Sequence, residues 1–261
     1  MRNNGQKKEA IRQNLLLFLK NPNYNGFHNF SKKEKIIVLL KVLALTYICL
    51  FIVNIPVAIL KKLELISEIS MKTEIFLRSV NTCNLNYKPY FLFSTILFVP
   101  LLEELSFRLF LVKFRVRYFI ISISLLSGMI IKYFLGNIFW IPQSYILMSV
   151  VNIIYILIIS VLMAGGLCLF KNQIIRIEEF WNKNIGFIIY SVAILFSLGH
   201  IINLSFKNSD LIFMPLILLP FFVSGLSFSY IRIKLGIAYS IILHFIFLLI
   251  SYGLPELLKT L

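Results

Sequence analysis

The sequence predicts an all-α, polytopic membrane protein with about seven transmembrane helices. Hydrophobic residues make up 59% of its 261 positions and charged residues only 14%, whereas a soluble domain has about 45–50% apolar residues. Apolar runs long enough to cross a bilayer recur along the chain, since a helix of about 20 residues spans a hydrocarbon core of about 30 Å. Basic residues gather in the short segments between these runs, as in proteins oriented by cytoplasmic positive charge.

Seven apolar runs are candidate spans. They are Ile36–Leu60, Tyr90–Val112, Tyr118–Leu135, Tyr145–Phe170, Ile185–Phe206, Leu211–Ile231 and Leu235–Gly253. The third run is the weakest candidate, because it contains Lys132. A tilted helix, an interfacial helix or one part of a longer broken helix would also fit this run.

The distribution of cations indicates a cytoplasmic N-terminus. With that orientation, 16 of the 26 Lys and Arg residues fall in cytoplasmic segments, 7 fall in outer segments and 3 lie inside spans. An excess of basic residues is typical of the cytoplasmic side. We therefore expect a multi-pass protein of the cell membrane whose C-terminus lies outside.

Four segments follow from this arrangement. Residues 1–35 form a cytoplasmic tail, 36–89 the first span and an outer loop, 90–253 a helical core and 254–261 a C-terminal tail. Within the first tail, Gln6–Lys20 can place apolar side chains on one helical face and basic ones opposite. That pattern is typical of a helix at an anionic membrane surface, although a solvated leader fits the same residues equally well.

The net charge of +15 bears on the choice of partner. A basic chain can bind nucleic acid, but no soluble domain remains here to do so, and we expect membrane lipid instead.

The cysteines are Cys49, Cys83 and Cys168, without a C-x-x-C motif. Neither a structural zinc site nor a disulfide framework is therefore expected. No cleavable signal peptide is expected either, because a polar and basic stretch precedes the first long apolar run.

Two adjacent carboxylates are candidates for chemistry. Of the 11 acidic residues, Glu103 and Glu104 alone lie well within a predicted span, where a charge costs about 2.5–3.5 kcal/mol on insertion scales. Glu104 and Arg108 stand four residues apart, so they share a helical face and can pair. Glu103 points about 100° away and has no such local cation. A buried carboxylate that can reach water is a candidate general base.

A structural interpretation of these three residues is also open. A buried Glu–Arg pair can fix helix packing or line a transport path. One pair requires only one glutamate, however, so the second glutamate favours chemistry.

Two histidines lie in other predicted spans, His200 and His244. A single intramembrane histidine is more often a satisfied polar contact than a catalyst. Two of them beside a Glu–Glu–Arg helix favour a site, because imidazole can act as base, donor or metal ligand near neutral pH. The ring of Phe196, four residues before His200, can pack against the imidazole. Gly199 and Gly236 are expected to allow close approach between helices.

Other intramembrane protease sites fit this sequence less well. The H-E-x-x-H helix of zinc metalloproteases is absent. An aspartyl protease needs two membrane aspartates, and the only one here is Asp210, at the edge of a span. Ser227 could be paired with His244 as a serine protease, but no glycine follows that serine.

The order of these residues resembles the CPBP intramembrane proteases, the family of CAAX prenyl endopeptidases, bacteriocin-processing proteins and lysostaphin-resistance-like proteins. Its pattern is E-E-x-x-x-R, then F-x-x-x-H, then H-x-x-x-N, each on a different helix. The matching residues are Glu103-Glu104-x-x-x-Arg108, Phe196-x-x-x-His200 and His244. The resemblance covers roughly Tyr90 to Gly253. It implies a CAAX endopeptidase-like helical bundle and a bacterial hydrolase that acts in the membrane.

The resemblance also implies a mechanism, in which water attacks a peptide bond of a membrane-associated or prenylated substrate. Glu103 with His200 would activate the water, and His244 would stabilise the oxyanion, a donor role worth about 10²–10³ in rate. Glu104 and Arg108 would hold the helix and set the electric field. Metal use is left open. Catalysis by Glu and His without a metal fits these residues, and so does a divalent metal such as zinc held by Glu103, His200 and His244.

One position departs from the family pattern. Leu248 stands four residues after His244, where the family usually has Asn or another polar residue that helps to polarise the scissile carbonyl. That role would then pass to Asn203 or Ser240. Leu248 favours a first alternative, a noncatalytic family member that acts in bacteriocin self-immunity or as a membrane scaffold. A second alternative is a proton-coupled transporter, which the absence of internal repeats disfavours.

Overall fold

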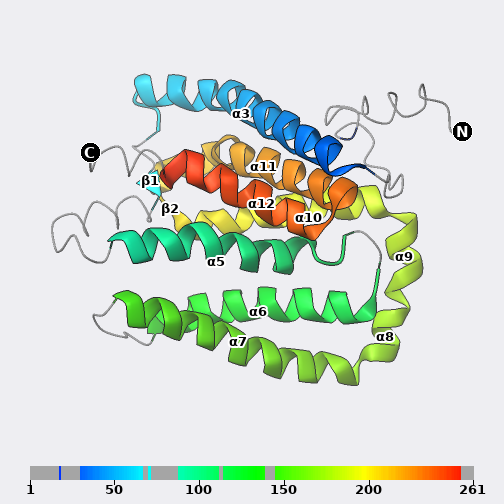
Figure 1. Ribbon diagram of the computed structural model, residues 1–261. Coiled ribbons are helices and arrows are strands. Elements are labelled where there is room, and N and C mark those ends of the chain that lie inside the picture. The colour runs from blue at the N-terminus through cyan, green and yellow to red at the C-terminus, as the bar shows by residue number, and fades with distance from the viewer. Residues whose placement is uncertain are drawn as a thin grey trace, which may run out of the picture. The chain divides into compact units, whose positions relative to one another are not determined.

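The computed structural model of the protein describes residues 18, 30–66, 70–71, 88–111, 114–138 and 145–253. Most of this part of the chain is helical (Figure 1). The α-helices are α3 (Lys32–Lys62), α5 (Lys88–Arg108), α6 (Val116–Ile138), α7 (Tyr145–Leu169), α8 (Lys171–Ile175), α9 (Ile177–Lys183), α10 (Ile185–Gly199), α11 (Met214–Leu235) and α12 (Ile237–Leu248). Short 3₁₀ or π-helical turns cover His200–Asn203, Asn208–Phe213 and Leu249–Gly253. Two-residue strands, β1 (Ser70–Met71) and β2 (Leu204–Ser205), pair antiparallel with Ser70 opposite Ser205.

The predicted helical fold class is confirmed, and a helix lies at each of the seven predicted apolar runs. Among the described residues, Lys32–Lys62 and Asn208–Leu235 are long and apolar enough to cross a membrane. A third candidate exists if Ile153–Leu169 and Lys171–Lys183, bent by 80°, are counted as one span. The seven-span topology and the cytoplasmic N-terminus stay predictions.

Several of these helices expose large apolar side chains. Phe51 on α3 is 73% exposed and Leu162 on α7 is 70% exposed. Large exposed apolar surfaces mark contact with a membrane or a partner. Helices of this composition and surface are compatible with a location in the membrane.

The chain divides into two compact units. The first contains residues 1–79 and 185–243, and the second contains 80–184 and 244–261. The four segments predicted from the sequence stay a prediction. The predicted helix at Gln6–Lys20 lies outside the described residues apart from Phe18, and so does the C-terminal tail at 254–261.

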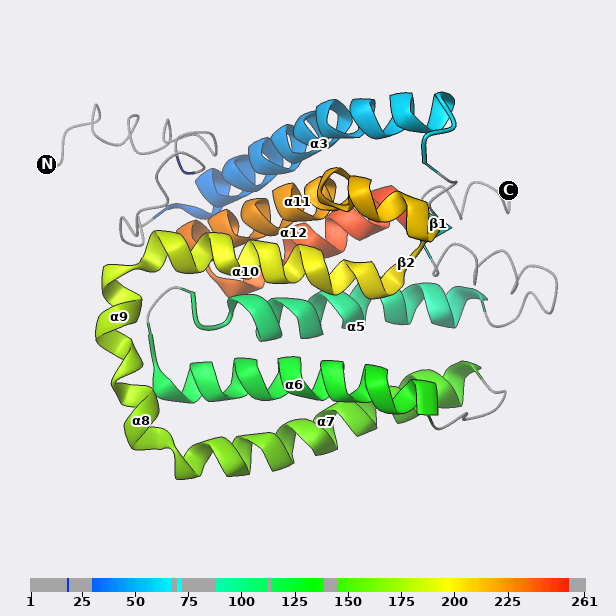
Figure 2. The ribbon, with the colours of Figure 1, turned by 180° about the vertical axis from the view of Figure 1, so that it is seen from behind.

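In the first unit α11 packs against both α3 and α10 (Figures 1 and 2). The start of α3 is fixed by a capping box, in which the Ser31 hydroxyl accepts from the Glu34 N–H and the Glu34 carboxylate accepts from the Ser31 N–H. This arrangement satisfies two backbone donors that the first helical turn leaves unpaired. A hydrogen bond links α10 to α11, in which the Ser197 hydroxyl donates to the Leu218 carbonyl at 2.8 Å.

Gly225 on α11 lies at a close approach between helices in this unit. A Cβ atom there would lie 3.1 Å from a ring carbon of Phe196 and 3.4 Å from the Cα atom of Ala193, both on α10. The sequence prediction of close approach at Gly236 is wrong, since no neighbouring atom of the described residues would lie within 4 Å of a Cβ atom at this position. Gly236 instead caps the C-terminus of α11 with φ of 103°, a conformation that other residues adopt at a cost. For Gly199 the prediction stays open.

In the second unit α5, α6 and α7 lie side by side with α6 in the middle (Figures 1 and 2). A Cβ atom at Gly128 on α6 would lie 2.5 Å from the Ser160 hydroxyl and 2.8 Å from the Ile156 carbonyl oxygen, both on α7. The backbones of α6 and α7 therefore approach closely because this residue has no side chain. The unit thus places the end of α5 against a tightly packed helix pair.

Candidate active site

Three charged side chains on α5 are buried near its C-terminal end. Glu104 and Arg108 have no exposed surface, and Glu103 is 8% exposed. The Arg108 guanidinium donates to Oε1 of Glu104, one helical turn earlier. This contact confirms the pairing predicted from the four-residue spacing, and it compensates the buried charge of Arg108.

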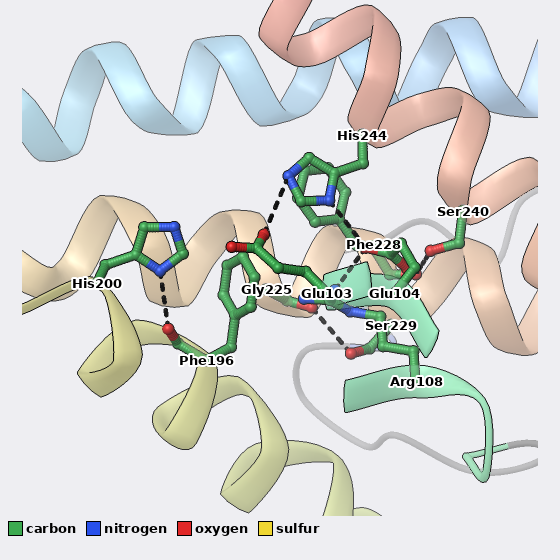
Figure 3. Close-up of polar contacts among 10 residues, drawn as sticks. All are labelled: Glu103, Glu104, Arg108, Phe196, His200, Gly225, Phe228, Ser229, Ser240 and His244. Atoms are coloured by element: carbon green, nitrogen blue, oxygen red, sulfur yellow. Dashed lines mark hydrogen bonds and ion pairs between the residues drawn. The ribbon is translucent and has the colours of Figure 1, made fainter. Parts of the chain in front are cut away.

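His244 on α12 belongs to the same unit and bridges the two carboxylates. Its Nδ1 atom lies 3.0 Å from Oε1 of Glu104, and its Nε2 atom lies 3.6 Å from Oε2 of Glu103. Figure 3 shows the imidazole directed at both glutamates. His244 is buried, with 3% of its surface exposed. The structure thus brings together four of the five predicted site residues, namely Glu103, Glu104, Arg108 and His244.

The contact with Glu104 bears on which imidazole nitrogen of His244 carries hydrogen. An ionised Glu104 carboxylate can only accept hydrogen bonds, and in that state Nδ1 is the donor. The other nitrogen, Nε2, then faces Glu103 at a distance just beyond a direct hydrogen bond. If Nε2 is protonated as well, the two carboxylates, the guanidinium and the imidazolium together carry no net charge. A buried group of charges is less costly when it is balanced in this way.

The end of α5 is anchored by two serines. The Ser122 hydroxyl on α6 donates to the Leu105 carbonyl at 2.8 Å, which is one of the last four carbonyls that a helix cannot pair internally. On α5 itself, Ser106 contacts the sulfur of Met129 on α6 at 3.4 Å. These contacts fix the segment that carries the two glutamates. Sequence reasoning missed Ser122, although a serine inside an apolar run is a usable signal.

His200 lies in the first unit, at the 3₁₀ turn that follows α10. Its ring centroid is 4.6 Å from that of Phe196, as predicted from their spacing, and 4.4 Å from that of Phe221, on which it stacks. Nδ1 lies 2.9 Å from the Phe196 carbonyl oxygen. Because a carbonyl can only accept, Nδ1 is the donor in this contact. That His200 shares a site with Glu103 and His244 stays a prediction.

Asn203 and Ser240 were predicted to replace the polar group that is missing at Leu248. The Ser240 hydroxyl is buried and donates to the Phe228 carbonyl at 2.9 Å (Figure 3), so its hydrogen is already engaged. The side chain of Asn203 lies outside the described residues. Leu248 ends α12, one turn after His244. Ser240 is therefore a poor replacement for the missing asparagine.

The donor set for a metal can be tested against these contacts. A catalytic zinc site takes three protein ligands. Within the part of the chain that the structure describes, no group of three or more His, Cys, Asp and Glu side chains could hold a metal ion. Because His200 belongs to a different unit from Glu103 and His244, a metal held by these three side chains stays a prediction.

Comparison with protein-family models, curated proteins and solved structures finds no match to this chain. A relation to the CPBP proteases stays a prediction from the sequence motifs.

Proposed function

We propose that this protein is an intramembrane endopeptidase of the CPBP type that hydrolyses a peptide bond in a membrane-associated or prenylated substrate. One observation carries the proposal. A histidine is oriented by one glutamate through Nδ1 while its Nε2 faces a second glutamate. Active nucleophiles and bases are commonly arranged this way, with a third group that orients the base. The motif resemblance assigns the same residues to catalysis.

In the proposed reaction Glu103 acts as the general base. Its carboxylate takes a proton from a water molecule, and the water oxygen attacks the carbonyl carbon of the scissile peptide. The Nε2–H group of His244 donates to the resulting oxyanion, which is charge stabilisation of the oxyanion-hole kind. The tetrahedral intermediate then collapses and the carbon–nitrogen bond breaks. The proton held by Glu103 passes to the leaving nitrogen, so the carboxylate is regenerated.

Glu104 and Arg108 are positioning residues in this scheme. Glu104 accepts from both Arg108 and the Nδ1 atom of His244, which fixes the orientation of the imidazole. Arg108 neutralises Glu104, and neither side chain has exposed surface. The motif resemblance further assigns water activation to His200, whose Nδ1 atom contacts the Phe196 carbonyl oxygen.

The proposal includes the seven-span topology with a cytoplasmic N-terminus. The apolar helices at the seven predicted runs and the exposed apolar side chains on α3 and α7 support it. The excess of Lys and Arg in the segments assigned to the cytoplasm supports the orientation.

A noncatalytic scaffold or immunity protein is the second candidate. Two observations favour it. The four clustered side chains are almost entirely buried, as in a network that only fixes helix packing, and Leu248 cannot polarise a carbonyl. In this case the charged cluster would be needed for folding and not for turnover.

Substitution of Glu103 separates the two candidates. Glu103→Gln keeps the shape of the side chain and removes the base, so cleavage should fall at least about a hundredfold, within the range of general acid–base catalysis. The assay uses purified full-length protein in detergent with two fluorogenic probes, a prenylated peptide and an unmodified apolar peptide. Glu179→Gln, an exposed substitution on α9, is the matched control and should retain full activity.

The melting temperature of each variant is measured beside its activity. An inactive Glu103→Gln variant that melts like the parent supports catalysis. Full cleavage by this variant, or full biological function in cells, contradicts the catalytic proposal and supports the scaffold.

A further inference from the structure

The chain turns sharply after α7. The axes of Ile153–Leu169 and Lys171–Lys183 differ by 80°. Arg176, between α8 and α9, has φ of −63° and ψ of −20°, which is helical geometry. Residues Lys171–Lys183, called the α8–α9 segment from here on, therefore continue as a short helical rod nearly perpendicular to an apolar helix that precedes them.

One side of the α8–α9 segment is fixed to the rest of the second unit. Ile174 and Trp181 are its buried residues, and their spacing of seven places them on one helical face. The Trp181 ring lies between 5.0 and 5.9 Å, by centroid, from three phenylalanine rings at the end of α5 and the start of α6. They are Phe110, Phe114 and Phe119. These contacts hold the rod in place on one side, and its remaining sides face away from the second unit.

The outer sides of the rod combine apolar and basic side chains. Ile175 and Phe180 are exposed, and so are Leu169 and Phe170 at the bend. Five cations are exposed on the rod and on the neighbouring start of α6, against two acidic residues on the rod. The cations are Arg115, Arg117, Lys171, Arg176 and Lys183, and the acids are Glu178 and Glu179. Exposed apolar groups next to an excess of cations are typical of a helix at a membrane interface.

We propose that the α8–α9 segment lies in the plane of the membrane interface and binds anionic phospholipid headgroups. Its orientation across the end of α7 is the one that an interfacial helix takes beside a helix that crosses the bilayer. Its exposed isoleucine and phenylalanine enter the boundary between headgroups and acyl chains, and its cations contact the phosphates. An acidic protein partner would satisfy the cations but leave the apolar side chains Leu169 and Phe170 without lipid. This surface is independent of the glutamate–histidine cluster and of the proposed hydrolysis.

The first test removes charge from the rod. Full-length protein in detergent is titrated with phosphatidylglycerol or phosphatidylcholine, and bound lipid is measured by native mass spectrometry. Arg176→Gln/Lys183→Gln should weaken phosphatidylglycerol binding about thirtyfold, from the contribution of each basic residue near an anionic surface. Phosphatidylcholine binding should not change. Lys61→Gln/Lys62→Gln, two exposed cations at the end of α3, is the control of equal charge and should bind phosphatidylglycerol like the parent.

Equal weakening in both double variants would show a response to net charge alone and would overturn the proposal. Unchanged phosphatidylglycerol binding in both double variants would also overturn the proposal. Tighter binding of an acidic peptide than of phosphatidylglycerol to the parent protein would overturn it as well. Arg176→Lys keeps the charge and should retain phosphatidylglycerol binding. This variant controls for a folding defect caused by substitution at position 176.

The second test locates the exposed apolar side chains. In protein whose native cysteines are replaced by serine, an environment-sensitive fluorophore is attached at Ile175→Cys or at Asn172→Cys, and the protein is placed in vesicles of phosphatidylglycerol and phosphatidylcholine. The label at position 175 should be quenched by brominated lipid and the label at exposed position 172 by aqueous iodide. Iodide quenching of both labels without lipid quenching would overturn the interfacial position.

Discussion

Replacing Glu104 by glutamine removes the charge on which two buried cationic or polar groups depend. Arg108 and Nδ1 of His244 both donate to Oε1 of Glu104, and neither Glu104 nor Arg108 has exposed surface. Breaking a buried ion pair by removing one partner costs about 3–5 kcal/mol. For a chain of this size about 1 kcal/mol shifts the melting temperature by about 2–4 °C, so Glu104→Gln should lower it by about 6–20 °C.

The assay is thermal unfolding of purified protein in one detergent, with three variants compared. Glu103→Gln should change the melting temperature by much less, because the contact of Glu103 with His244 is longer, at 3.6 Å. Glu104→Gln/Arg108→Met removes both charges and should recover part of the lost stability, since replacing both partners avoids an uncompensated charge. The difference between single and double variants measures the coupling of the pair.

Two results would refute this reasoning. One is a melting temperature of Glu104→Gln within about 2 °C of the parent, which corresponds to about 1 kcal/mol or less. The other is a double variant less stable than Glu104→Gln alone, because the charge left on Arg108 would then not be the cause.

Further predictions concern topology, chemistry and packing. A cysteine at Lys259 should react with an impermeant thiol reagent in intact cells and one at Lys7 should not, and the reverse pattern would contradict the proposed orientation. Leu248→Asn should raise the cleavage rate if the missing polar group limits turnover, and a chelator should leave the rate of the parent unchanged; a loss of activity on chelation would contradict the metal-free mechanism. Gly128→Ala should destabilise the protein by about 1–3 kcal/mol through overpacking against α7, whereas Gly165→Ala, with open space around it, should be neutral or stabilising by up to about 1 kcal/mol in a melting assay.

Local spacing in the sequence determined a large part of this protein. Runs of apolar residues located the helices, because backbone groups in an apolar surrounding must pair within the helix. Residues four apart on a helix are neighbours, so the pairs Glu104–Arg108 and Phe196–His200 could be predicted and the structure confirms both. The start of α3 was not predicted, although Ser31 and Glu34 form a capping box whose three-residue spacing is a local sequence signal.

Contacts between distant segments were decided only by the tertiary structure. His244 meets Glu104 across 140 residues of sequence, and the helical period says which face each residue occupies but not which helix that face meets. The sequence therefore identified His244 as a candidate site residue but did not show that Glu104 orients it. The role of a glycine was equally open from the sequence, because a residue without a side chain permits either a close helix approach or a positive φ. The structure shows that Gly225 allows close packing of α11 against α10, whereas Gly236 has a positive φ at the turn into α12.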